Sequence, residues 1–247
     1  MGVGVNRTGT VSILAVHASA AVTTISSSSS VLDINLTLFG VATTVVPLLP
    51  AAGSAPPAYN VTASLASFSL PPIGLSTGAL TDTASSSYPP TETGTAISTI
   101  DVLMLDMSPI LGLSAETISS TSSVDGRSAT GSTAIDNLTL TVLGSTTTFS
   151  GSPPPNDLIF DSGGLTVTLN QQIPDTSETA GISTNAIAID FVHFPANTNV
   201  VNGSIDIASS TASIVAIPEP AIWLEMLAGF GAVGLLMWGR TWSKGAA

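Results

Sequence analysis

Short segments in which apolar and polar residues alternate, separated by stretches rich in Pro and Gly, dominate this sequence. In VLDINLTL the side chains of Leu32, Ile34, Leu36 and Leu38 fall on one face of an extended chain. A period of two residues indicates a half-buried β-strand. Comparable segments are YNVTASLASFSL, TAISTIDVLML, TAIDNLTLTVL, GLTVTLNQQ, NAIAIDFVHF and GSIDIASSTASIVAI. The turn-forming stretches between them are PLLPAAGSAPP, LPPIGLSTG, SSSYPPTETG, VDGRSATGS and SGSPPPND.

No amphipathic helical window of any length accompanies these segments. The pattern therefore predicts an all-β fold, either an antiparallel β-sandwich or a barrel-like domain. Strand faces rich in Ser and Thr are expected to face solvent, where β-branched Thr also favours extended backbone. The serine run at 26–30 is expected to precede the first strand.

The order of the segments suggests an internal duplication. LDINLTLFG (32–40) resembles IDNLTLTVLG (135–144), and TAISTIDVLML with the later ETISSTSS resembles GISTNAIAIDFVHF with the later DIASSTAS. Two related halves of a sandwich, or two stacked sheets, would explain this recurrence. Chance similarity in a sequence of low complexity is the alternative explanation.

The charge balance excludes several classes of partner. The 247 residues include sixteen acidic and four basic side chains, giving a net charge of −12. Nucleic acid needs clustered Lys and Arg, so no nucleic-acid partner is expected. A hydrophobic content of 44% is too high for a wholly disordered polar chain. Because the chain has no cysteine, it has neither disulfides nor a thiol catalyst.

The segment from Ala221 to Gly239 is apolar, with Glu225 as its only charged residue. As a helix it would be about 28 Å long, close to the thickness of the hydrocarbon core of a bilayer. The residues expected at the membrane interfaces are Trp223, Trp238, Trp242, Arg240 and Lys244. Positive charge is retained on the cytoplasmic side, so the preceding domain is predicted to face outward. A buried core helix is the alternative.

Pro218, Glu219 and Pro220 stand directly before this segment and separate it from the strands upstream. The motif, the apolar span and the basic end, in this order, resemble the PEP-CTERM sorting signal of exosortase substrates. The resemblance covers 218–247. It implies export, anchoring in the inner membrane through the C-terminal helix, and cleavage near the motif by an exosortase-type membrane processing enzyme. Glu225 and the sparse basic end depart from the family pattern and put the efficiency of processing in question.

Residues 1–25 have two interpretations. They form either a degenerate signal peptide or a disordered N-terminus, and a misassigned start codon would also explain the sequence. In the first interpretation Arg7 precedes a short apolar run at 11–16, and Ala18-Ser19-Ala20 is the cleavage site. An outward-facing domain requires export, which favours a leader.

The segments of 29–217 resemble the choice-of-anchor P family of bacterial surface proteins. The similarity rests on DINLTLFG, YNVTASL, NDLIFDSGGLTVTLNQQIP, STNAIAIDFVHF and SIDIASSTAS, in that order. The resemblance implies an exported all-β passenger domain of unassigned biochemical activity.

Few residues suggest chemistry. Asp190 and His193 lie three residues apart, but strict alternation places Asp190, Val192 and Phe194 on one face and His193 on the other, so no catalytic triad is expected. Asp157 and Asp161 flank a turn and could converge on Ca²⁺, although solvated carboxylates explain them as well. No catalytic residue, resident metal or cofactor is predicted.

The sequence thus predicts a non-enzymatic, exported protein of the cell surface or of the extracellular biofilm matrix, sorted by its C-terminal signal. Exopolysaccharide is one expected partner. Two alternatives remain: an adhesin that binds carbohydrate or Ca²⁺, and a secreted hydrolase.

Overall fold

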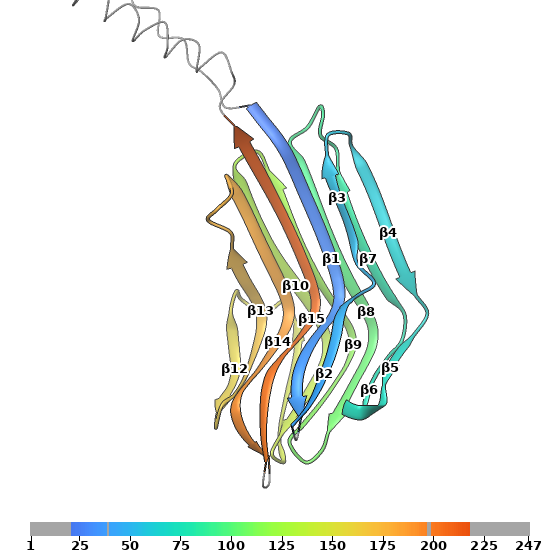
Figure 1. Ribbon diagram of the computed structural model, residues 1–247, viewed down its shortest axis with the longest axis vertical. Coiled ribbons are helices and arrows are strands. Elements are labelled where there is room, and N and C mark those ends of the chain that lie inside the picture. Colours follow the sequence, from blue (N-terminus) through green and yellow to red (C-terminus); the bar gives the residue numbers. More distant parts are fainter. Residues whose placement is uncertain (1–20, 39, 197–198, 218–247) are drawn as a thin grey trace, which may run out of the picture. The chain divides into compact units, whose positions relative to one another are not determined.

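The computed structural model describes residues 21–38, 40–196 and 199–217, and these form fifteen β-strands and one short 3-10 helix. The strands make two antiparallel sheets, A and B, which confirms the predicted all-β class. Figure 1 shows the two sheets stacked as layers, with β1, β14 and β15 of sheet A lying over β8, β9 and β10 of sheet B.

Sheet A joins the beginning and the end of the described chain. Its strands, in spatial order, are β12 (Asp157–Ser162), β13 (Leu165–Pro174), β14 (Ala180–Ala196), β15 (Asn199–Ile217), β1 (Ala21–Leu38) and β2 (Val41–Leu48). A further strand, β3 (Ala51–Ala55), pairs with the first half of β1, while β2 pairs with its second half. The stretch PLLPAAGSAPP, predicted as a turn, therefore contains β3.

Sheet B is built from the middle of the chain. Its path runs through β11 (Ser145–Gly151), β10 (Ser128–Val142), β9 (Leu111–Asp125), β8 (Thr93–Met107), β6 (Leu75–Thr77) and β5 (Phe68–Leu70). Off this path, β7 (Leu80–Ser86) pairs with β8, and β4 (Tyr59–Leu65) pairs with β7. The 3-10 helix η1 (Pro71–Ile73) connects β5 to β6.

The segments that resemble each other in the sequence occupy equivalent places in the two sheets. Strand β1 forms a hairpin with β2 and lies beside β15, and β10 forms a hairpin with β11 and lies beside β9. The pair β8–β9 in sheet B likewise corresponds to β14–β15 in sheet A. Sheet A thus combines the hairpin β1–β2, from the first half of the chain, with β12 to β15 from the second half. Sheet B combines the hairpin β10–β11, from the second half, with β4 to β9 from the first half.

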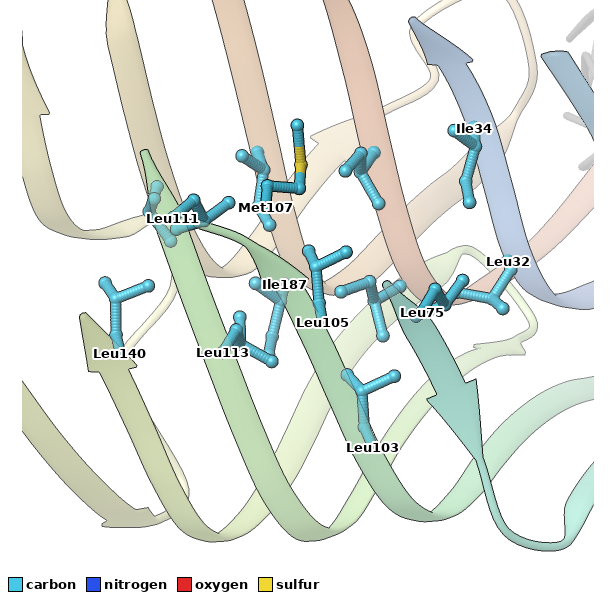
Figure 2. Packing of buried hydrophobic residues seen from close by; sticks show 14 of the residues in the cluster. Leu32, Ile34, Leu75, Leu103, Leu105, Met107, Leu111, Leu113, Leu140 and Ile187 are labelled. Carbon is cyan, nitrogen blue, oxygen red and sulfur yellow. The ribbon is translucent and has the colours of Figure 1, made fainter. Parts of the chain in front are cut away.

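Alternation along each strand supplies the core between the sheets. The main cluster is mostly aliphatic and draws on both layers; Figure 2 shows Ile34 and Ile187 of sheet A together with Leu103, Leu105 and Leu113 of sheet B. A smaller cluster at the other end of the strands contains Ile25, Val124, Ala212 and Ile214. Burying each of the larger side chains, Val, Leu, Ile, Met or Phe, contributes about 1.5–3 kcal/mol, so these clusters hold the two sheets together.

Between the two clusters the sheets meet through hydroxyl groups. Ser122 donates a hydrogen bond to Thr184 Oγ1 (2.9 Å), and Ser120 to Ser210 Oγ (3.0 Å), across the two sheets. Closer to β1, Ser98 donates to the carbonyl of Ser30. These interior Ser and Thr residues correct the prediction that hydroxyl-rich faces point to solvent: a hydroxyl is readily buried where it finds a partner. The serine run 26–30 also lies inside β1 rather than ahead of it.

Candidate functional site

The residues of the predicted sorting signal lie outside the described residues. These are the motif Pro218, Glu219 and Pro220, the span 221–239, and the interface residues Trp223, Trp238, Arg240, Trp242 and Lys244. Within the described ranges, no helix has the length and apolar character needed to cross a membrane.

His193 and Asp190 do not form a catalytic pair. The side chain of His193 is exposed, and its backbone N–H donates to Asn202 Oδ1 (2.8 Å). A register shift between Phe191 and Phe194 interrupts the pairing of β14 with β15, and His193 adopts a φ of 52° there.

This β-bulge corrects the predicted face of Phe194. Strict alternation placed Phe194 on the same face as Asp190, but Phe194 is buried together with Phe191, and their rings meet edge to face at 6.1 Å. A bulge inserts one extra residue into a strand and so reverses the side on which later residues point.

Contrary to the prediction, Asp157 and Asp161 do not flank a turn: both lie on the single strand β12, the former half-buried and the latter exposed. They pair opposite Leu169 and Thr166 of β13, and a register shift separates them. In the part of the chain that the structure describes, no group of three or more His, Cys, Asp or Glu side chains is placed to hold a metal ion.

Asp82 is a buried acidic residue that the sequence interpretation overlooked. Its side chain is fully buried on the inner face of β7, and neither carboxyl oxygen has a hydrogen-bond partner. Burial raises the pKa of Asp82 to about 7, and the nearby polar groups of Ser98, Ser29 and Val31 offset the rise only in part. Neither hydroxyl bonds to Asp82: Ser98 donates to the backbone carbonyl of Ser30, and Ser29 donates to that of Thr83. In LTDTASS, a period of two residues places Asp82 on the same face as Leu80 and Ala84. This alternation is the sequence pattern from which the burial of Asp82 could have been predicted.

A second perturbed carboxyl lies on the outer face of sheet A. Burial raises the pKa of Asp206 to about 6, and the negative charges of Asp190 and Asp33 on the flanking strands add to the rise. Asn185 donates to Asp206 Oδ1 (3.0 Å) and to Gln171 Oε1 (2.8 Å). The outer face of sheet A is therefore acidic and internally hydrogen-bonded.

Two hollows could receive a ligand. One, of about 340 Å³, is a shallow groove on sheet A lined by small and hydroxyl-bearing residues that include Ser26, Ser28, Ser54 and Thr211. The other, of about 290 Å³, lies among the turns that follow β1, β8, β10 and β14. Its lining is mainly apolar and includes Leu38, Ile73, Met107, Ile110 and Leu143, with the carboxylate of Asp106 beside them. The first hollow suits a polar ligand, and the second suits a small apolar group.

The fold and these features define a two-layer, all-β sandwich with buried inter-sheet hydroxyls and an acidic outer face. The chain matches no protein-family model, no curated protein and no solved structure.

Proposed function

We propose that this chain is an exported protein of the cell surface or extracellular matrix, whose β-sandwich is a passenger delivered by a C-terminal sorting signal. The passenger would be of the choice-of-anchor P type and the signal of the PEP-CTERM type. In this proposal the 221–239 helix anchors the protein in the inner membrane until an exosortase-type enzyme cleaves near Pro218-Glu219-Pro220 and releases or transfers the passenger.

The order of the C-terminal sequence elements carries this proposal: Pro218-Glu219-Pro220 comes first, the apolar segment 221–239 follows, and Arg240 and Lys244 come last. The all-β fold supports it. The sandwich described over 21–38, 40–196 and 199–217 has its own core and its own strand pairing, as an independent passenger domain requires.

The test compares three forms of the chain in a Gram-negative host that expresses an exosortase. They are the full chain, a form without 218–247, and a variant in which Pro218, Glu219 and Pro220 are all replaced by Ala. We expect the full chain to be processed and to reach the surface or the medium. The form without a tail should remain soluble in the periplasm, and the Ala variant should accumulate uncleaved in the membrane fraction.

Mass spectrometry of both mature termini completes the experiment, with Ala21 expected as the first residue. Identical fractionation of all three forms, with intact termini, would refute the proposed sorting.

A carbohydrate-binding adhesin is the second candidate, favoured by the hydroxyl-lined groove on sheet A. Sugar hydroxyl groups both donate and accept hydrogen bonds, as Ser and Thr hydroxyls do. A glycan array probed with the full chain and with Thr211→Tyr, which would fill the groove, tests this function. Glycan binding that Thr211→Tyr abolishes would support it, whereas no binding, or equal binding by both forms, would exclude this groove as the site.

A further inference from the structure

The outer face of sheet B carries side-chain hydroxyls in rows that cross three adjacent strands. Strands β7, β8 and β9 pair without a register shift in this region, so their outward residues align. The three rows are Ser85–Thr95–Ser123, Thr83–Ile97–Thr121 and Thr81–Thr99–Ser119. We name these nine residues the hydroxyl face. All of them are exposed or half-buried, and eight are Ser or Thr.

The flanking strands extend the same rows. On β4, Asn60, Thr62 and Ser64 pair opposite Ser85, Thr83 and Thr81. On β10, Thr130, Ser132 and Ala134 pair opposite Ser123, Thr121 and Ser119. None of these fifteen positions carries a charge or an aromatic ring, although the whole chain has a net charge of −12. Carboxylates stand in the next row at each end: Asp101–Thr117–Asp136 beyond Thr99 and Ser119, and Thr93–Asp125–Ser128 beyond Thr95 and Ser123.

The hydroxyl groups of the hydroxyl face are free to bind molecules outside the protein. Among the described residues, none of these eight side-chain hydroxyls makes a hydrogen bond with another protein group; Thr83 and Ser85 take part only through their backbone carbonyls. Each hydroxyl offers one donor and two acceptor lone pairs. The face is therefore a two-dimensional array of donors and acceptors that no other protein group occupies, interspersed with the methyl groups of Thr and the side chain of Ile97.

The spacing of the array follows from sheet geometry. Neighbouring strands lie about 4.8 Å apart, and outward residues recur every second position, about 6.8 Å along each strand. Oxygen atoms on the faces of ice repeat over distances of the same order. Because adjacent strands twist relative to one another, the match to a planar lattice is closest over neighbouring strands, which makes β7, β8 and β9 the centre of the array.

The layer behind the array holds these strands in place. Their inward residues include Ala84, Ala96, Ser120 and Ser122, all buried against sheet A. Ser122 and Ser120 are hydrogen-bonded across to Thr184 and Ser210. An array on a supported sheet does not have to be ordered when it meets a ligand, which lowers the entropic cost of binding.

We propose that the hydroxyl face binds ice. Its chemistry disfavours other classes of ligand: without Lys or Arg it cannot neutralise phosphates, without carboxylates it cannot hold a hard cation, and without aromatic rings it lacks the stacking surfaces that bases use. To bind a lattice of ordered water, a protein surface needs regularly spaced hydroxyl groups on a rigid support, with methyl groups between them. The hydroxyl face has both kinds of group on a rigid sheet.

The test uses the full chain in detergent micelles, with empty micelles as the blank. We expect the protein to be taken up into a slowly growing ice hemisphere and to slow recrystallisation of polycrystalline ice. Thr121→Tyr, at the centre of the face, should lower the ice-bound fraction by about tenfold, corresponding to about 1.4 kcal/mol of binding free energy. Ile97→Lys should have a similar effect because a strongly hydrated charge disrupts the array.

Thr168→Tyr is the matched control, since Thr168 is a half-buried Thr on the outer face of sheet A. It should bind ice as the wild type does, and equal thermal melts will show that all variants are folded. Exclusion of the wild-type protein from ice would overturn the proposal, as would an equal loss in Thr168→Tyr. Retention on an insoluble neutral glucan that Thr121→Tyr abolishes, without any effect on ice, would overturn it in favour of a glycan surface.

Discussion

Asp82 places a carboxyl group in the interior, where neither of its oxygens accepts a hydrogen bond. Burial raises the pKa of Asp82 from 3.8 to about 7, so the folded protein holds this proton in weakly acidic solution while the unfolded chain releases it. Between about pH 4 and pH 7 the unfolded state therefore binds fewer protons than the folded state. Consequently the free energy of unfolding falls as pH rises through this window, by about 1.4 kcal/mol per pH unit at most, and levels off above it.

Replacing Asp82 by Asn removes the ionisation and keeps the shape of the side chain. We expect Asp82→Asn to be more stable than the wild type at pH 8 by a few kcal/mol, and the difference to shrink as pH falls towards 4. Urea unfolding at several pH values measures this, with the exposed residue changed in Asp161→Asn as control. Parallel pH profiles for Asp82→Asn and the wild type would show that Asp82 does not hold its proton in the fold.

Single residues also show where sequence interpretation fails. No strand was predicted at β7, so the buried Asp82 was overlooked, although the alternation of this regular strand places it on the inner face. Alternation itself fails at Phe194, because the bulge after Phe191 depends on pairing with β15, a later strand. The local sequence of one strand does not contain that information.

Among the elements, β15 approaches the backbone of β1 closely at Gly203. This residue has a φ of +122°, and an added Cβ would collide with the backbone carbonyl oxygen of Asn35. We expect Gly203→Ala to lower the free energy of unfolding by about 2–4 kcal/mol, from backbone strain together with steric overlap.

Gly151→Ala separates these two causes. Gly151 has a similar φ of +119°, but a Cβ added there would meet no atom within 4 Å, so only strain remains. Chemical denaturation should show a smaller loss for Gly151→Ala than for Gly203→Ala. Equal losses would mean that the contact with Asn35 contributes nothing.

At this scale the sequence predicts the strands better than their arrangement. Period-two alternation identified β1, β8, β10, β13, β14 and β15, and the similar segments fell in equivalent places. It read β4 and β5 as one segment, and it placed β3 and β6 in stretches predicted as turns. It assigned no strand to β2, β7, β9, β11 or β12. The sequence analysis also predicted that Ser and Thr side chains face solvent. A hydroxyl group can lie on either face of a strand, and which face it takes depends on a hydrogen-bond partner that the local sequence does not reveal. Ser122 is buried because Thr184, distant in sequence, accepts its hydrogen bond.

For the whole molecule, the main electrostatic feature is the large excess of acidic over basic residues. The chain has sixteen acidic residues, of which only Glu219 and Glu225 lie outside the described ranges, and Arg127 is the only Lys or Arg within them. A single guanidinium cannot pair with so many carboxylates, so the sandwich carries net self-repulsion. Such repulsion destabilises the compact state while it keeps the protein soluble.

Salt should therefore stabilise the sandwich. The Debye length falls from about 30 Å at 0.01 M to about 10 Å at 0.1 M salt, so repulsion between carboxylates on different strands is screened. We expect the free energy of unfolding in urea to rise by on the order of 1 kcal/mol when NaCl increases over this range at pH 8.

Neutralising exposed carboxylates should reproduce the effect of salt. Asp101 and Asp136 both lie opposite Thr117, on the strands to either side of it. The double variant Asp101→Asn with Asp136→Asn should be more stable than the wild type at low salt and should respond less to added NaCl. Stability that is constant or falls with salt in the wild type would show that local contacts, rather than the summed charge, decide how this acidic sandwich holds together.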